Sequence, residues 1–364
     1  MKICFIVGAF PPMKCGIGDY TNLLGRELVK MGYEVTIITS RNAKYINEDN
    51  YKVKNIIDKW DNYAKDIIIR TVRESNADIV NIQYPSDEYK KGLFMNILPM
   101  ILKKQCNVKV VETVHEYLNY TYKGKIRNLI NYLYADNLIV VEKLYIDKIR
   151  SFLPIISKGI KISYIPISSN IPKSTLSKEE LIKFKNTLVS NNEKLISYFG
   201  FINDLKGVET LLNSFKLFNE RINSKLLIIS ELNLNNDYHK KIFNQIERLG
   251  LRQKVIVTGF NDNVDKIANY LVSSDVCVLP FRDGVSERNG SFLAALNQGI
   301  PIITTSKEDK ISSNGVYYVK PNDDLSIVKY LNKLSDNKEQ YERSSLSWES
   351  IAREYINVYS RLLK

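Results

Sequence analysis

The chain has 364 residues, 44% of them hydrophobic and 25% charged, and its formal net charge is +12. That length exceeds what one core normally holds, so we expect a globular protein of two domains. The sequence has no apolar run long enough to cross a bilayer. Its first apolar run, residues 2–8, is too short for a signal peptide, so a first buried strand is expected there.

The cysteines and the charges limit the choice of partners. Cys4, Cys15, Cys106 and Cys277 are scattered without metal-ligand spacing, so we expect neither a disulfide framework nor a zinc site, and a cytoplasmic location. Residues 1–172 hold 25 Lys and Arg against 17 Asp and Glu, a balance of +8 that leaves +4 for the remainder. An excess of positive charge attracts nucleic acid, an anionic membrane face or phosphorylated substrates. Alternatively, the lysines are only solvated surface residues of a protein from a lysine-rich proteome.

Strands and helices alternate in the first half of the chain. After residues 2–8 comes a loop, Ala9–Ile17, in which Gly16 and then Gly18 allow close backbone approach, and then a helix to about Met31. The glycines do not match the G-x-G-x-x-G pattern, so a nicotinamide or flavin site is weakly supported. Further strands are expected at residues 34–39, 78–83, 108–113, 137–141 and 161–167, and helices at about 92–103 and 125–134.

A segment rich in Ser, Asn and Pro, residues 168–175, indicates a linker, after which the pattern restarts. The predicted fold class is α/β, with two successive doubly wound parallel sheets. In the second half we expect strands at 194–199, 225–229, 255–258, 275–279, 302–304 and 316–319, and helices at about 206–218, 239–249, 264–272, 290–298, 323–334 and 348–363.

The stretch Val276–Thr305 combines a strand, a polar loop, a helix and a second strand, which together predict a right-handed βαβ unit. Ligands of such sheets bind outside the carboxyl ends of the strands, so residues 282–291 are expected on the ligand side. The amides of Gly290, Ser291 and Phe292 would be unpaired donors at a helix start, which suits a diphosphate. Alternatively, Ser291 is only the N-cap of that helix.

Two basic side chains follow strands at the expected ligand edges. His115 comes after the strand at 108–113. A functional role and a purely structural role as a hydrogen-bonded loop histidine are about equally supported for it. His239 is expected at the surface. Lys206 is expected to open a helix, where its charge opposes the helix dipole unless an anion binds, although a solvated lysine at a frayed end would also fit. No Asp-x-Asp pair, Walker motif or Gly-x-Ser-x-Gly elbow occurs, so Lys206, arginines and helix starts would have to meet a phosphate charge.

An ordered set of motifs resembles one enzyme family over nearly the whole chain. The segments are FPPMKCGIGDYT, VHE, IPISSNIP, FGFINDLKGVETLL, VTGF followed by VLPF, and SERNGSFLAALNQGIPIITT. They resemble the retaining glycosyltransferases of the family-four type, typified by bacterial sucrose, mannosyl and lipopolysaccharide transferases. The resemblance implies the GT-B fold, with two Rossmann-like domains facing a cleft. It implies an acceptor domain at 1–172, a nucleotide-sugar domain at 173–346, and a helix at 347–364 that crosses back to the first domain.

The resemblance also implies roles for single residues. Gly16, with Gly18 near it, would meet the donor diphosphate, His115 would contact the transferred sugar, and Lys206 would bind the diphosphate. The start of the later helix would complete the donor site with Arg288, Asn289, Gly290, Ser291 and Phe292.

Two departures from the family pattern concern the donor. The first of the family's two glutamates falls on Ser286, with Glu287 one place away as the candidate catalytic carboxylate, and the second falls on Ala294. The arginine usual before the lysine is absent, and Phe201 and Asn203 occupy that region. The identity of the donor is therefore less closely implied than the fold.

We expect a retaining, metal-independent glycosyltransferase of polysaccharide biosynthesis. It would move a sugar from a nucleotide-sugar donor to a glycan or lipid-linked acceptor, with no cofactor and no nucleic-acid partner. Catalysis would depend on positioning and on stabilisation of the leaving diphosphate by Lys206 and the amides of residues 290–292. One alternative is a sugar-nucleotide 2-epimerase, against which the presence of only two histidines argues. Another is a non-catalytic nucleotide-binding partner of a transferase, which the missing glutamate at Ala294 motivates.

The basic first half suggests a loose contact with the anionic inner face of a membrane, where the acceptor would be held. The apolar helix expected at 92–103 is bracketed by Lys90-Lys91 and Lys103-Lys104. Aromatic and basic side chains after His115 would add contacts: Tyr120, Tyr122, Lys123, Lys125 and Arg127. Alternatively, the apolar residues of this helix belong to the core and the lysines solvate its ends.

Overall fold

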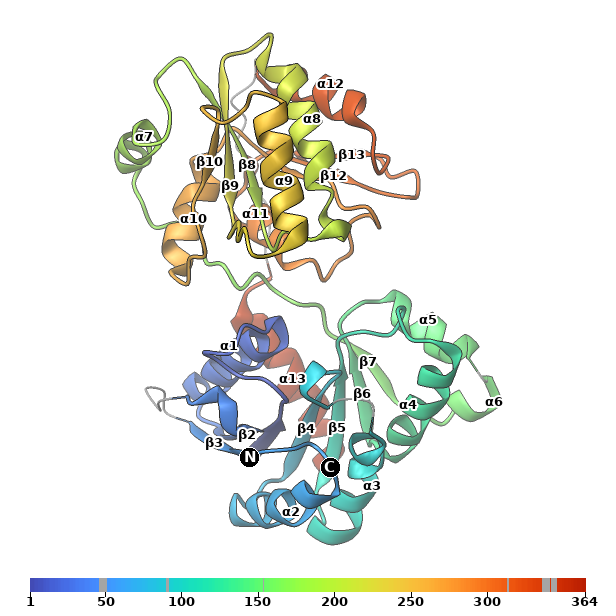
Figure 1. Ribbon diagram of the computed structural model, residues 1–364. Helices are drawn as coiled ribbons and strands as arrows, with labels where there is room; N and C mark the ends of the chain where they lie inside the picture. The colour runs from blue at the N-terminus through green and yellow to red at the C-terminus, as the bar shows by residue number, and fades with distance from the viewer. Residues whose placement is uncertain (46–50, 90–91, 153, 313, 336–340, 342–345) are drawn as a thin grey trace. The chain divides into compact units, whose positions relative to one another are not determined.

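The computed structural model describes residues 1–45, 51–89, 92–152, 154–312, 314–335, 341 and 346–364. The chain forms two compact units, drawn in Figure 1. The first domain combines Met1–Ser168 with Leu346–Lys364, and the second is Ser169–Ser345. The division after Ser168 lies shortly before the expected boundary at residue 172, and the last helix belongs to the first domain.

The first domain is built on a parallel sheet of seven strands in the order β3-β2-β1-β4-β5-β6-β7. Its strands are β1 (Lys2–Ile6), β2 (Glu34–Ser40), β3 (Lys52–Ile57), β4 (Ile79–Tyr84), β5 (Lys109–Val114), β6 (Asn137–Val140) and β7 (Ile162–Tyr164). Its helices are α1 (Gly16–Lys30), α2 (Lys65–Glu74), α3 (Phe94–Cys106), α4 (Tyr122–Tyr134), α5 (Leu144–Ser151), α6 (Pro154–Ser157) and α13 (Trp348–Leu363).

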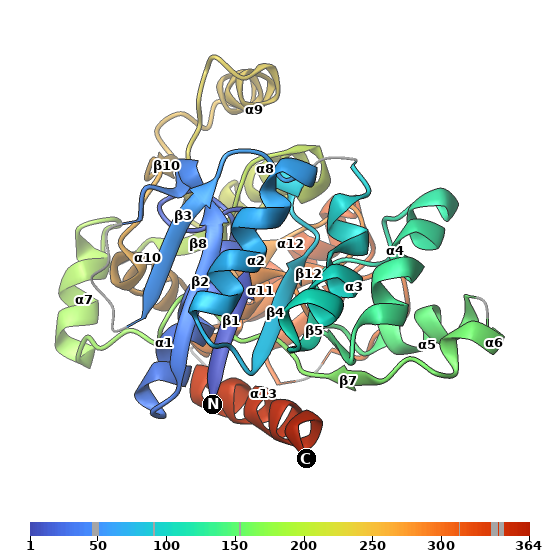
Figure 2. The same cartoon turned by 90° about the horizontal axis from the view of Figure 1, so that it is seen from below.

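Alternation along β1 shows how helices cover both faces of this sheet. Ile3 and Phe5 share a buried cluster with residues of α1 and α13, whereas Cys4 and Ile6 share another with residues of α2 and α3. Because side chains alternate across a strand, these clusters lie on opposite faces. Figure 1 shows α13, in red, beside α1, and Figure 2 shows α2 and α3 over the other face. Both faces are covered, which explains the continuous apolar strands.

The second domain repeats the plan with six parallel strands in the order β10-β9-β8-β11-β12-β13. The strands are β8 (Lys194–Phe199), β9 (Ser224–Ile229), β10 (Val255–Val257), β11 (Val276–Leu279), β12 (Ile302–Thr305) and β13 (Val316–Val319). The helices are α7 (Lys178–Asn186), α8 (Val208–Asn219), α9 (Asp237–Arg248), α10 (Val264–Val272), α11 (Gly290–Asn297) and α12 (Asp324–Ser335). The prediction of two doubly wound α/β halves is confirmed.

The helix at 92–103, considered as a membrane face, is the core helix α3. Phe94, Met95 and Leu98 are buried, and the Lys103 ammonium lies 2.9 Å from the carboxylate of Asp136. The core alternative is therefore confirmed for this helix and the membrane role is wrong, while residues 90–91 lie outside the described residues. Among the described helices, none has both the length and the apolar run that a membrane span requires.

Candidate functional site

His115 lies at the carboxyl end of β5, as expected, and three neighbours hold it. Its Nε2 is 2.8 Å from Gln83 Oε1, and its backbone N–H donates to the carbonyl of Tyr84 over 2.8 Å. The ring of Tyr20 meets the imidazole edge-on, with 4.9 Å between ring centroids. The imidazole is half-buried, so one part of it is fixed by the domain and another reaches the surface.

A buried polar network lies beneath this histidine. Gln83 Nε2 donates to Asn81 Oδ1 at 2.9 Å, and Thr113 Oγ1 donates to the same oxygen at 3.0 Å. Asn81 Nδ2 donates to the Tyr359 hydroxyl at 2.7 Å, and Thr113 lies 3.1 Å from the Tyr355 hydroxyl. The three strand residues are fully buried, so the hydrogen bonds offset the cost of placing polar groups in a sheet interior.

The two glycines of the first loop play different roles in packing. Gly16 is exposed at the first position of α1, and a Cβ added to it would meet no other atom within 4 Å. The N-cap, Cys15, makes no side-chain hydrogen bond to the helix. A Cβ on Gly18 would lie 2.6 Å from the Ala9 carbonyl oxygen. Gly18 therefore serves the close packing of α1 on the first loop, whereas the helix start at Gly16 stays open.

Lys206 of the second domain does not open a helix, contrary to expectation. It ends a 3₁₀ turn, Asp204–Lys206, and α8 begins two residues later. Gly207 between them has φ +65°, and a Cβ on it would lie 2.0 Å from the Pro280 carbonyl oxygen. Only glycine allows this close approach. It brings the Lys206 ammonium to 4.8 Å from the centroid of the Phe281 ring, at the carboxyl end of β11.

The face of the Phe281 ring attracts the Lys206 ammonium, but the other surroundings of this lysine disfavour a cation. Burial lowers the pKa of its ammonium, and the neighbouring charge of Arg288 lowers that pKa further. Within the described part of the chain, Lys206 makes no ion pair with a carboxylate. Arg282, by contrast, lies 2.6 Å from Asp204 and 3.2 Å from Glu209. The arginine is neutralised within the domain, and the lysine is not.

The start of α11 lies at the same edge of the sheet. Its N-cap is Asn289, whose side chain does not cap the helix but accepts from the backbone N–H of Ser286 at 2.6 Å. The alternative in which Ser291 is the N-cap is therefore wrong. A Cβ on Gly200, the residue after β8, would lie 3.4 Å from Ser291. The amides of Gly290–Phe292 thus begin an uncapped helix beside the end of β8 and favour an anion there.

The remaining candidates of this loop are less uniform. Arg288 and Phe292 are half-buried, whereas Glu287 is exposed. Ala294, where the family has a glutamate, is fully buried in the core of the domain. The positive charges of Lys206 and Arg288 therefore lie close enough to interact, whereas the side chain of Glu287 is more exposed than either.

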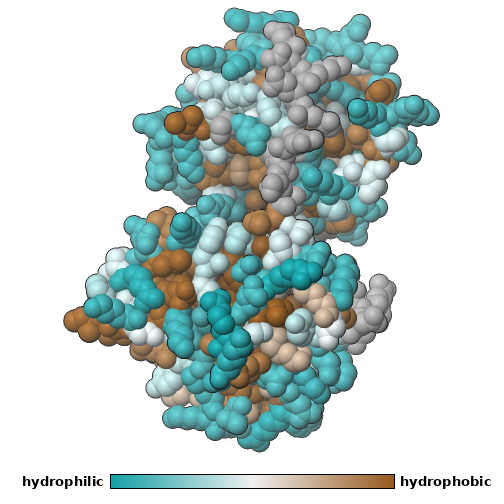
Figure 3. All heavy atoms as spheres, turned by 180° about the vertical axis from the view of Figure 1, so that it is seen from behind, coloured by the Kyte–Doolittle hydropathy of each residue, from teal (hydrophilic) through white to brown (hydrophobic). Residues whose placement is uncertain are grey.

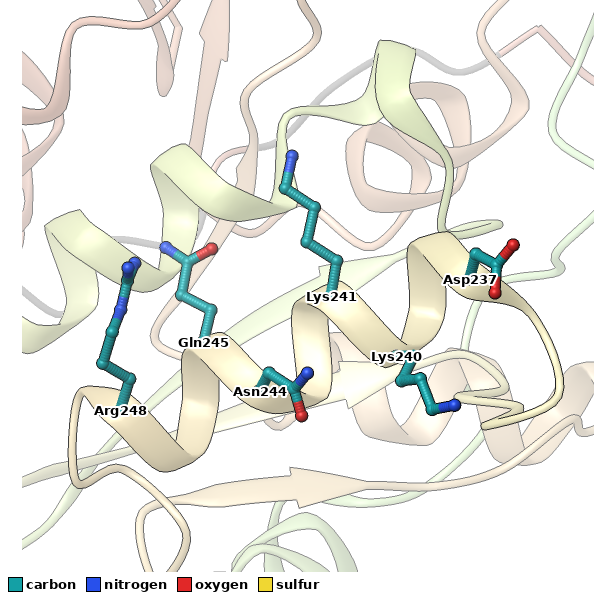
Figure 4. Close-up of a pocket in the computed structure, with 6 residues that line it drawn as sticks. All are labelled: Asp237, Lys240, Lys241, Asn244, Gln245 and Arg248. Atoms are coloured by element: carbon teal, nitrogen blue, oxygen red, sulfur yellow. The ribbon is translucent and has the colours of Figure 1, made fainter.

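A surface depression elsewhere in this domain contains none of the candidate residues. It lies over α9 and has a volume of about 360 Å³, and its lining side chains are drawn in Figure 4. Lys241 pairs there with Glu209 at 3.1 Å, and Gln245 donates to the side chain of Asn213 at 2.8 Å. These contacts hold α9 against α8, so the depression serves packing between the two helices.

Sequence reasoning missed several residues that shape these edges. Asn81 and Gln83 lie in a segment that was predicted only as a strand. Two amide side chains inside the run DIVNIQ could have indicated a buried polar network there. Phe281 and Gly200 adjoin predicted strands, but no local pattern indicates that they approach Lys206 and Ser291.

Comparisons with known proteins agree with this architecture. Residues 179–346 match the family model described as glycosyl transferases group 1. An uncharacterized glycosyltransferase of Methanocaldococcus jannaschii is 26% identical over 396 residues, covering 99% of this chain and 98% of the relative.

Two solved structures share the fold over nearly their whole length. A glycosyltransferase from Rickettsia africae aligns with a TM-score of 0.78 at 15% identity, covering 100% of this chain and 98% of its own. Anabaena HepE, solved in complex with UDP, aligns with a TM-score of 0.72 at 14% identity over the same shares. The two flanked parallel sheets are the GT-B fold, residues 179–346 match the glycosyl transferases group 1 model, and the chain is a glycosyltransferase.

Proposed function

We propose that the enzyme transfers a sugar from a nucleotide-sugar donor with retention of configuration and without a metal ion. The observation that carries this proposal is the half-buried Lys206, without a carboxylate partner in the described chain and beside Arg288. A diphosphate would relieve the repulsion between the two cations and bind the uncapped start of α11. HepE, which has been solved with UDP and with UDP-glucose, supports a nucleotide sugar as the donor.

Lys206, Arg288 and the amides of residues 290–292 would act mainly on the leaving group. As the bond from the sugar to the diphosphate breaks, negative charge grows on the departing oxygen, and these groups are already in place to stabilise it. The acceptor hydroxyl forms the new bond to the sugar on the same face, and its proton passes to the departing phosphate oxygen. His115 would orient the sugar, and no enzyme nucleophile is assigned.

The direct test is release of nucleoside diphosphate from a panel of nucleotide sugars, with and without glycan or lipid-linked acceptors, in the presence of EDTA. Transfer that continues in EDTA and gives a product with the donor's anomeric configuration is expected. Conversion of a sugar nucleotide without acceptor would instead indicate a 2-epimerase. Absence of both reactions, together with no binding of any nucleoside diphosphate, would refute the proposal.

The role of His115 can be tested separately. Substitution of His115 by Ala should impair transfer while nucleoside diphosphate affinity, measured by calorimetry, stays nearly unchanged. The reason is that the histidine belongs to the first domain, whereas the cations and the helix start that would bind the diphosphate belong to the second. A large loss of diphosphate affinity would contradict the proposed role.

We further propose a glycan or lipid-linked acceptor held at the anionic cytoplasmic face of a membrane, and helix α4 supports it. This helix buries two amide side chains and exposes several apolar ones. Asn128 and Asn131 are fully buried, whereas Tyr122, Ile126 and Leu133 are 67%, 45% and 51% exposed. An apolar stripe on the outside of a helix is unusual for a surface that faces only water.

The same apolar surface continues onto the neighbouring segment. Leu144 of α5 and Ile155 and Ile156 of α6 are exposed, and Figure 3 shows hydrophobic atoms at this edge of the first domain. Exposed lysines surround them: Lys123, Lys143, Lys148 and Lys158. We call these lysines and the exposed apolar residues of α4, α5 and α6 the α4–α6 surface; its apolar members are Tyr122, Ile126, Leu133, Leu144, Ile155 and Ile156. Apolar side chains bordered by lysines suit the interface of an anionic membrane.

Vesicle sedimentation tests this surface. The wild-type protein should bind vesicles containing phosphatidylglycerol at low salt, and less at high salt or with phosphatidylcholine alone, because screening weakens lysine contacts. Ile155→Ser with Ile156→Ser should weaken binding. Leu325→Ser, which changes a side chain 73% exposed on α12 of the second domain, is the matched control and should bind as the wild type does. Equal binding to both lipids would remove the membrane claim.

A further inference from the structure

We infer that Tyr355, on the C-terminal helix α13, is a positioning residue for His115 and acts through Thr113, Asn81 and Gln83. This inference rests on the proposed role of the histidine in sugar transfer. The path contains only contacts within the first domain. It joins a hydroxyl on the last helix to an imidazole at the ligand edge of the sheet, although 242 positions separate Thr113 from Tyr355 in the sequence.

The hydrogen bonds along this path determine which group donates and which accepts in each pair. Asn81 uses its amide N–H to donate to Tyr359, so its Oδ1 accepts from both Gln83 and Thr113. Because Thr113 has used its only proton, it must accept from the Tyr355 hydroxyl, 3.1 Å away.

The same order continues on both sides. Tyr355 has given its proton to the threonine, so it accepts from the Tyr20 hydroxyl at 2.8 Å. Gln83 turns its amide nitrogen toward Asn81, so its Oε1 faces His115 and accepts from Nε2 at 2.8 Å. The network therefore requires the proton of a neutral His115 to be on Nε2.

Burial makes this arrangement specific. Asn81, Gln83 and Thr113 are each fully buried, and the Tyr355 side chain is also fully buried. A polar group left without a partner at such depth is costly, so each member restricts the orientation of the next. Loss of the Tyr355 hydroxyl would leave Thr113 Oγ1 to accept from Gln83 Nε2 alone, now 3.4 Å away, and allow the amide of Gln83 to turn. The imidazole would then lose its fixed tautomer and position.

Tyr355→Phe tests the inference with little change of shape. We expect kcat/KM for sugar transfer to fall about tenfold or more, as misplacement of a reacting group does, while nucleoside diphosphate affinity and the circular dichroism spectrum stay as in the wild type. Tyr132→Phe is the matched control, because Tyr132 is equally buried in the same domain and its hydroxyl has no hydrogen-bond partner in the described structure. It should transfer sugar as the wild type does.

A second readout does not depend on activity. The chain has two histidines, so long-range ¹H–¹⁵N spectra, assigned with His115→Gln, report the tautomer of His115 directly. We expect the Nε2–H form in the wild type and in Tyr132→Phe, and a mixture of tautomers in Tyr355→Phe. Gln83→Glu should raise the pKa of His115, because a carboxylate would then face the imidazole. An unchanged tautomer with unchanged kcat/KM in Tyr355→Phe would overturn the inference, whereas inactivity of the wild type would count only against the proposed function.

Discussion

The two ligand-side edges of this enzyme are organised by different forces. In the first domain, His115 rests on neutral side chains whose hydrogen bonds are mutually satisfied. In the second, close backbone packing at Gly207 places Lys206 near Arg288 without a carboxylate partner for the lysine in the described residues. The first edge fixes a geometry in advance, and the second holds a charge imbalance that an anion would correct. In the proposed function, orientation of the sugar and stabilisation of the leaving group would depend on residues of different domains.

The largest expected effect comes from removal of the charge at the second edge. Lys206→Ala should lower kcat by about 10²–10³-fold, the loss of roughly 3–4 kcal/mol that follows removal of one preorganised charge-stabilising group. The free energy of unfolding should stay constant or rise, because the lowered pKa shows that the folded domain disfavours the ammonium.

Steady-state kinetics and urea unfolding measure the two effects of Lys206→Ala. Lys240→Ala, which removes an exposed lysine from α9, is the control and should change neither quantity. Turnover at the wild-type rate in Lys206→Ala would end the assignment of this lysine.

Gly207→Ala tests whether packing, rather than charge, builds the second edge. A Cβ would lie 2.0 Å from the Pro280 carbonyl oxygen at a φ of +65°, so strain and displacement should cost about 3 kcal/mol of unfolding free energy. Gly250 has φ +67° and no atom within 4 Å of the added Cβ. Gly250→Ala should therefore show only the strain of the left-handed backbone, about 1–2 kcal/mol. Equal losses in thermal or urea unfolding would show that the contact with Pro280 is unimportant.

One buried carboxyl group makes the stability of the first domain depend on pH. Glu112 is fully buried on β5, the side-chain amide of Asn131 donates to it, and burial raises its pKa from 4.5 to about 8. The folded state therefore holds a proton that the unfolded state has lost between these two pH values. Stability is fully present below about pH 4.5 and declines as the pH rises to about 8.

Glu112→Gln should remove this pH dependence, because the amide keeps the shape but cannot ionise. At pH 8 the variant should be more stable than the wild type by about 2 kcal/mol, less than a shift of this size would give without relaxation. Urea unfolding between pH 5 and pH 8 measures it. Glu74→Gln, at an exposed position of α2, should leave the pH profile unchanged. A parallel profile in Glu112→Gln would show that the buried carboxyl is not the cause.

The positions of most strands and helices along the chain could be predicted, because long Val/Ile runs and glycine stops are local signals. The edge strand β3 and helix α2 were missed. The residues KVK of β3 alternate polar and apolar side chains, which is a signal of a half-buried strand, but the run is short. Helix α7 was also missed. None of its residues is buried, so its sequence lacks the apolar stripe that indicates a helix packed on a core. Lys206 and Arg288 were identified singly. Their proximity arises from tertiary packing that no local pattern contains, whereas the hydrogen bond from Ser286 to Asn289 is a local contact within the loop.

The place of α13 in the first domain has a consequence for biosynthesis. Ile351, Ala352 and Tyr355 belong to the same buried cluster as Ile3 and Phe5 of the first strand. A nascent chain emerging from the ribosome therefore cannot complete its first domain until the second has been synthesised. Its open apolar face stays available to chaperones during that interval. A nonsense mutation shortly before Trp348 would damage the domain that was translated first and leave the sheet of the later one intact.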